Sequence, residues 1–163
     1  MDIHSIELLE FDKIRKELIG YCLSEEGGDR VSNQPFVFEA AALEELHMTV
    51  EEIVQLFERE DPPGFDFFPI EEPMEALSTE GTIIEGENLF AASRYFESAV
   101  RLSRYLSKGC EYGYERITAL ADELPDLSQH ARSIQKVLDP DGSVKESHPE
   151  LKGLRKKLGQ TRN

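Results

Sequence analysis

Tryptophan is absent from this 163-residue chain, and only two cysteines and eight prolines are present. Two cysteines cannot build the multi-bridge framework of small secreted domains, so Cys22 and Cys110 are expected to be reduced thiols. Modest proline content without a glycine repeat excludes collagen-like and other fibrous classes. The composition instead fits a globular, helix-rich protein, and the length suffices for a domain with its own core.

Long hydrophobic runs are also missing. No apolar stretch approaches the roughly 20 residues that a membrane-spanning helix needs. The opening residues Met1-Asp2-Ile3-His4 lack the basic segment and apolar stretch of a secretory signal. We therefore expect a cytoplasmic protein with no membrane partner.

Positive charge is scarce: 18 Lys and Arg residues face 33 Asp and Glu residues, a net charge of −15. Six of the basic and two of the acidic residues follow Ser143, so the tail from Lys145 carries +4. The remaining 12 basic and 31 acidic residues give the first 144 residues a charge of −19. A surface this acidic repels phosphates, which makes the fragment a poor nucleic-acid binder by itself.

The tail alone could contact a nucleic-acid backbone, although a solvated helix face explains the same charges. The candidate contacts are Lys152, Arg155, Lys156 and Lys157.

Apolar residues recur at three- and four-residue spacing through most of the chain, which predicts an all-α fold. We expect an irregular bundle of about six to seven helices, with Gly27-Gly28 interrupting the second stretch and Gly109 ending the longest helix. The aromatic residues near Phe67 are expected to fill the core between helices. The expected helices lie near residues 11–21, 43–57, 74–77, 87–107, 117–124 and 127–138, and from 149 onward.

The cleanest amphipathic pattern lies in the second of these helices. Its apolar residues form one continuous stripe with glutamates opposite. The stripe comprises Leu43, Leu46, Val50, Ile53 and Phe57.

A turn separates the body of the chain from its tail. Asp139-Pro140-Asp141-Gly142 has the residues that a type I turn prefers, and we expect a short turn or hairpin near 139–144. A calcium loop would need glycine where Val144 stands, so the turn is favoured. The last helix starts at Pro149 and remains helical in pattern at Asn163, as if cut. We therefore expect a helical core domain at 1–144 and a truncated arm at 145–163.

Motifs for chemistry are absent from the sequence. No phosphate-binding loop, dinucleotide fingerprint or nucleophile elbow occurs. Glu44-x-x-His47 has the spacing of a di-iron ligand pair, but the second copy that such a site needs is missing. The four histidines lie on separate segments. We predict no catalytic, cofactor-binding or metal-binding residues and no enzyme activity in this fragment.

Four stretches in a fixed order carry a resemblance to a known family. The first stretch is similar to the start of MutS-II proteins: Leu9–Ile14 matches their Leu-Glu-Phe-x-Lys-Ile, and Ser24–Gly27 matches the Ser-Glu-x-Gly element that follows. Thr49–Glu52 resembles a Thr-x-Glu segment, and Ile84–Leu106 resembles the family's long Arg- and Leu-bearing helix. Leu138–Leu154 resembles the turn and helix start that follow.

The resemblance implies the N-terminal part of the helical core or lever domain of a MutS-II protein, a MutS relative without the mismatch-recognition domain. In that family the region leads into a clamp, an ATPase that uses ATP and magnesium, and often a C-terminal Smr nuclease. The whole protein is then expected to be a dimer that limits recombination at branched DNA or rescues stalled ribosomes. The fragment's role would be to couple the ATPase to the clamp.

Two other interpretations stay open at this stage. A free-standing acidic helical adaptor would bind a basic protein partner through its glutamate-rich faces. A carboxylate-rich metalloenzyme would need ligand spacings that the sequence lacks. The unfinished last helix favours the MutS-II interpretation.

Overall fold

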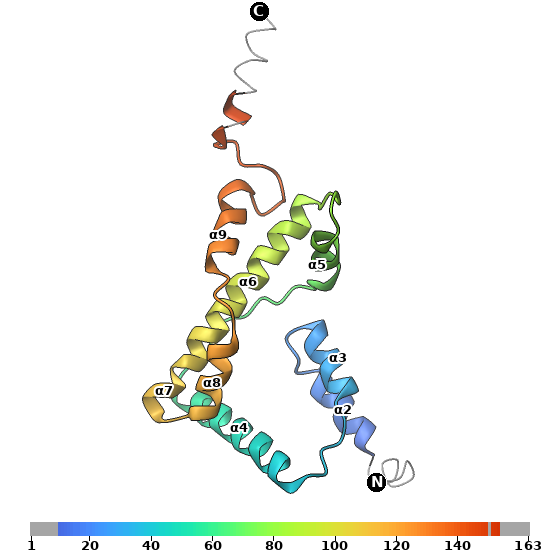
Figure 1. Cartoon of the computed structure of the whole chain (residues 1–163), viewed down its shortest axis with the longest axis vertical. Helices are drawn as coiled ribbons and strands as arrows, with labels where there is room; N and C mark the ends of the chain where they lie inside the picture. The colour runs from blue at the N-terminus through green and yellow to red at the C-terminus, as the bar shows by residue number, and fades with distance from the viewer. Residues whose placement is uncertain (1–9, 150, 154–163) are drawn as a thin grey trace, which may run out of the picture. The chain divides into compact units, whose positions relative to one another are not determined.

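The structure is a computed structural model that describes residues 10–149 and 151–153. These residues form helices joined by loops (Figure 1). One isolated antiparallel bridge joins Leu138 and Val144. The helices are α2 (Phe11–Ile19), α3 (Glu25–Asn33), α4 (Ala40–Arg59), α5 (Glu71–Ser78), α6 (Gly86–Ser107), α7 (Gly109–Tyr112), α8 (Glu115–Glu123) and α9 (Ser128–Val137).

The all-α prediction is confirmed, and most helices lie where periodicity placed them. Within the described residues there are eight helices, more than the six to seven expected. The expected bundle did not count α3 or the four-residue α7 as separate helices. Pro149 and residues 151–153 are helical, as predicted for the start of the last helix.

The expected break at Gly27-Gly28 is wrong, because both residues lie inside α3. Ser24 caps this helix: its hydroxyl accepts a hydrogen bond from the Gly27 backbone N–H at 3.0 Å. Gly28 is buried, and a Cβ there would meet the Ile19 side chain at 3.4 Å. The glycines therefore lie where α2 and α3 pack closely instead of ending the helix.

Contacts divide the chain into two compact units. The first contains residues up to Pro69 together with Arg101–Leu124, and the second contains Ile70–Val100 together with residues from Pro125 onward. The boundary between them falls inside α6. The predicted division at residue 144 remains a prediction.

The first unit has its core where α4, α6, α7 and α8 meet. Ile53 and Leu106 pack against this core from its edge. The fully or nearly buried members are Leu56, Tyr105, Tyr114 and Ile117.

The longest helix ends at Ser107, as the sequence predicts, and Gly109 lies two residues further on without capping it. It is buried as the first residue of α7, and a Cβ there would lie 2.7 Å from the Ile117 side chain. The left-handed residue is Gly113 instead, at φ 77°, and it ends α7. Close packing of α7 against α8 therefore accounts for glycine at 109.

In the second unit, α9 packs beside the N-terminal half of α6, where the Gln135 amide donates to the Ser93 hydroxyl at 3.3 Å. The predicted turn is confirmed: the Gly142 N–H donates to the Asp139 carbonyl at 2.9 Å, and Gly142 has φ 75°. A Cβ on Gly142 would overlap the start of α6 at Gly86 and Glu87. Glycine is thus required both by the turn and by its contact with α6.

The predicted stripe on α4 exists, but most of it does not face a core. Leu43, Leu46, Val50 and Phe57 are about half exposed, and only Ile53 is partly buried against the core cluster. The residue of α4 that is fully buried is Leu56. The helix packs against α8 through a different face.

The predicted core role of the phenylalanines near Phe67 holds only in part. The Phe65 and Phe67 rings stack with centroids 5.8 Å apart, but both side chains are half-buried and outside the core cluster.

No described helix is long and apolar enough to cross a membrane.

Candidate functional site

The four predicted nucleic-acid contacts are mostly beyond the part of the chain that the structure describes. Lys152 is exposed, and its backbone N–H donates to the His148 carbonyl at 3.0 Å in the first turn of the last helix. Arg155, Lys156 and Lys157 lie outside the described residues. The nucleic-acid role of all four remains a prediction.

A junction that sequence reasoning missed joins α4 to α8 through Glu52. Its Oε2 accepts hydrogen bonds from the backbone N–H groups of Arg116 at 2.9 Å and Ile117 at 3.1 Å. Because α8 begins at Glu115, these amides belong to its first turn, where N–H groups have no partner within the helix. Tyr114, the residue before α8, supplies no side-chain cap. Glu52 therefore caps α8 from a distant part of the chain and places negative charge at its N-terminus.

The Arg116 guanidinium completes the junction by binding two carboxylates. It donates to Glu52 Oε1 at 3.2 Å, and to both Glu45 oxygens at 2.9 and 3.1 Å in a bidentate pair. Hydrogen bonding to Arg116 lowers the pKa of Glu45, and the bonds to Glu45 and then Glu52 raise the pKa of Arg116. Glu45 and Glu52 are seven residues apart and therefore share one face of α4.

A second junction gathers three side chains at the C-terminal end of α4. The Tyr105 hydroxyl donates to the Glu60 backbone carbonyl at 2.8 Å, and the Tyr112 hydroxyl donates to the Glu60 carboxylate at 2.8 Å. Lys108 pairs with the same carboxylate at 2.5 Å. The bonds from Lys108 and Tyr112 lower the pKa of Glu60.

Together the two junctions hold α4, α7, α8 and the C-terminal half of α6 as one block. Nothing in their arrangement resembles a catalytic pair, since each carboxylate is held by cations and hydroxyl or amide donors. The sequence alone gives little indication of these junctions, because residues that meet in them, such as Glu52 and Arg116, are separated by 64 positions.

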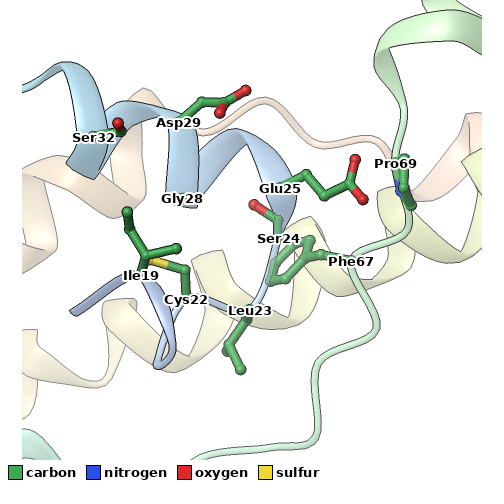
Figure 2. A pocket seen from close by; sticks show the side chains of 10 residues that line it. All are labelled: Ile19, Cys22, Leu23, Ser24, Glu25, Gly28, Asp29, Ser32, Phe67 and Pro69. Atoms are coloured by element: carbon green, nitrogen blue, oxygen red, sulfur yellow. The ribbon is translucent and has the colours of Figure 1, made fainter. Parts of the chain in front are cut away.

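The α2–α3 pair carries a pocket of about 650 Å³ (Figure 2). Cys22 lies in its wall, and its thiol donates to the Leu18 carbonyl at 3.5 Å. Among the lining residues there is no histidine or cation that would activate the thiol. The lining residues are Ile19, Cys22, Leu23, Ser24, Glu25, Gly28, Asp29, Ser32, Phe67 and Pro69.

A smaller pocket of about 240 Å³ lies beside the second junction. Its lining includes three cations, two from α6 and one directly after that helix, together with one acidic residue. Sequence reasoning had placed candidate phosphate contacts only in the tail. The pocket is lined by Asp61, Pro63, Arg101, Arg104, Tyr105 and Lys108.

Metal ligands were not predicted, and no group of three or more His, Cys, Asp or Glu side chains converges within residues 10–149 and 151–153. Both residues of the Glu44-x-x-His47 pattern are exposed on α4. The Asp141 carboxylate accepts hydrogen bonds from the Ser143 N–H and hydroxyl, which lower its pKa and hold the turn.

Comparison with known proteins finds relatives that share one name. The chain is 29% identical over 160 residues to Endonuclease MutS2 of Solidesulfovibrio magneticus, covering 97% of this chain. It is 24% identical over 156 residues, 94% of its length, to Endonuclease MutS2 of Lacticaseibacillus casei. The match covers 20% of each relative, so the chain spans about a fifth of the length of these curated proteins.

The resemblance to the MutS-II family that the ordered stretches predict is confirmed by these matches, which run over nearly the whole chain. No family model matches the chain. No solved structure matches it either.

Proposed function

We propose that this chain is the structural and coupling module of a longer MutS-II-type protein. The observation that carries the proposal is the likeness to MutS2 relatives over 94–97% of the chain but only a fifth of their length. A segment of that proportion is expected to act as one part of a larger machine. The relatives are named endonucleases, so nuclease activity elsewhere in a full-length protein is part of the proposal.

The junctions around Glu52 and Glu60 support a mechanical role. A module that transmits movement must resist bending between its ends, and charge-assisted hydrogen bonds that cap helices from outside provide that stiffness. Here α4 is held to α8 at Glu52 and to α6 and α7 at Glu60. We propose that this block relays nucleotide-driven movement from an ATPase to a clamp on branched DNA or the ribosome, in a homodimer.

The first test is to sequence the gene past the codon for Asn163. The proposal expects the reading frame to continue through further helical sequence into a phosphate-binding loop. A stop codon close to residue 163 would contradict it and would favour the acidic adaptor instead.

The second test applies to the full-length protein. Glu52→Ala should leave nucleotide hydrolysis measurable while weakening the dependence of DNA or ribosome binding on the bound nucleotide. Glu45→Ala is the matched control, because Glu45 is 65% exposed and does not cap α8. Full nucleotide dependence in the Glu52 variant would refute a coupling role for this junction.

The 163-residue chain itself should not hydrolyse ATP and should bind duplex or branched DNA weakly at physiological salt. Steady-state turnover assays and anisotropy titrations measure both. Tight, salt-resistant DNA binding by the chain would contradict the proposal, because its net charge of −15 opposes phosphate contacts.

A further inference from the structure

One face of α4 exposes an uninterrupted row of large apolar side chains, here named the α4 seam. A surface helix normally turns such a stripe toward a core, and an exposed apolar row of this length is typical of a binding surface. Its members are Leu43 (56% exposed), Leu46 (48%), Val50 (56%), Val54 (49%) and Phe57 (51%).

The spacing of the α4 seam indicates what shape of partner fits it. Leu43, Val50 and Phe57 are seven residues apart, and the exposed Leu46 and Val54 lie between them on the same face. This is the pattern by which one helix packs lengthwise along another. The complementary object is therefore a helix with its own apolar seam, about the length of the 20-residue α4.

Charge beside the seam indicates the chemistry of that helix. A second row, along one edge of the seam, consists of the glutamates that come directly after Leu43, Val50 and Phe57. These are Glu44, Glu51 and Glu58. All three are exposed, and none has an ion-pair partner within the described part of the chain. The carboxylates that Arg116 binds lie on a different face, so this row is available to cations of a partner.

A second copy of this chain is a poor occupant. Pairing two α4 seams would bring together two chains that each carry a net charge of −15, with a glutamate row from each chain beside the interface. A helix with lysine or arginine along the facing edge gains attraction where a second copy meets repulsion.

The N-terminal end of the seam also has room for an anchor. Leu43 and Leu46 contribute to an apolar groove of about 640 Å³, whose other walls include Phe11, Leu18 and Phe36 of the α2–α3 region. A bulky side chain of the partner fits there, and buried aromatic anchors dominate many interfaces.

We propose that the α4 seam docks an amphipathic helix of a separate, basic protein partner. That helix carries apolar residues at heptad spacing and lysine or arginine along the edge that meets Glu44, Glu51 and Glu58. The inference goes beyond the proposed coupling role and does not depend on it, because it stands on the exposed face of α4 alone.

Three labelled synthetic peptides of equal length test the proposal against the 163-residue chain by fluorescence anisotropy. The first has leucine at the heptad positions and lysine at the flanking positions; the second replaces lysine by glutamate; the third keeps the first composition in scrambled order. We expect the first peptide to bind one to one and gain helicity, with an affinity at least about tenfold above the other two. Binding of the scrambled peptide at equal affinity, or no binding of the first, would overturn the proposal.

Matched variants locate the binding. Val50→Glu should weaken the basic peptide at least about tenfold, whereas Leu77→Glu, at a side chain of similar exposure on α5, should change affinity less than about twofold. Circular dichroism establishes that both variants keep their helix content. Equal effects of the two substitutions would refute the assigned surface.

Charge reversal provides the second arm. The triple substitution Glu44→Lys, Glu51→Lys and Glu58→Lys should weaken the basic peptide and strengthen the acidic one. A control triple with the same charge change at exposed glutamates off α4 should do neither: Glu71→Lys, Glu75→Lys and Glu80→Lys. Equal effects of the two triple substitutions would show that the peptide responds to net charge only. A dimer in analytical sedimentation that Val50→Glu dissociates would show that a second copy occupies the seam. Either result would refute the proposal.

Discussion

Replacing Glu52 by alanine removes the external cap of α8, and the structure indicates how much stability should be lost. The Glu52 side chain is 14% exposed and accepts two backbone hydrogen bonds and one from a guanidinium. Loss of a helix cap costs about 1 kcal/mol. Loss of a charge-assisted hydrogen bond in a largely buried site costs about 1.5–3 kcal/mol. Since both losses involve one carboxylate and are not additive, Glu52→Ala should lower the free energy of unfolding by roughly 2–3 kcal/mol.

Two companion variants turn this magnitude into an ordering. Glu52→Gln keeps one oxygen that accepts from a backbone N–H but loses the charge, so its effect should be intermediate. Glu45→Ala should have the smallest effect, because the Glu45 side chain is 65% exposed and its ion pair is screened by solvent. The ordering tests the cap more sharply than any single value does.

The assay is urea unfolding followed by far-ultraviolet circular dichroism, since the chain contains no tryptophan. Amide hydrogen exchange adds local resolution: the Arg116 and Ile117 amides should exchange faster in Glu52→Ala than in Glu45→Ala. If Glu45→Ala destabilises as much as Glu52→Ala, or if these amides stay protected without Glu52, the capping argument is refuted.

Three further outcomes follow from the same structure. Gly109→Ala should lower the free energy of unfolding by roughly 1–3 kcal/mol, because the new Cβ meets the buried Ile117 side chain. The loss should be smaller in an Ile117→Val background. Additive effects in a double-mutant cycle measured by urea unfolding would contradict this. Tyr114→Phe should be neutral or stabilising, because the buried Tyr114 hydroxyl has no hydrogen-bond partner among the described residues, whereas Tyr105→Phe should cost about 1 kcal/mol in the same assay. The pKa of Glu60 is lowered in the folded state, so its contribution to stability is present above the ordinary glutamate pKa and is lost as pH falls through the lowered value. The free energy of unfolding, measured from pH 6 down to about 3, should therefore depend less on pH in Glu60→Gln. An unchanged slope would refute this.

Local signals predicted the helices well because helix ends depend on nearby residues. The expected helix at 87–107 is α6, Gly86–Ser107, and the Asp139–Gly142 turn closes with the predicted hydrogen bond. Pro149 is found at the start of a helical segment, as predicted. Such features need only a few consecutive residues to act.

Glycine was interpreted wrongly where packing determines its use. Gly28 and Gly109 were expected to break helices, since glycine costs about 1 kcal/mol in a helix interior. In the structure both are helical residues beside an isoleucine side chain: a Cβ on Gly28 would contact Ile19 at 3.4 Å, and one on Gly109 would overlap Ile117 at 2.7 Å. That neighbour is another helix, whose position a periodic pattern does not specify. The Glu52 cap was missed for the same reason, because its partner at Arg116 lies 64 positions further along.

The α4 stripe shows the limit of periodicity most directly. A heptad pattern establishes that Leu43, Val50 and Phe57 share a face, but the same pattern suits a face buried in a core and one that awaits a partner. Charge separates the two possibilities only after the structure shows which glutamates are engaged. Glu45 and Glu52 are held by Arg116 on the α8 side, which leaves the row beside the seam as the carboxylates that the proposed partner would meet. Acidic composition thus divides into carboxylates that join helices of this chain and carboxylates that remain for a basic partner.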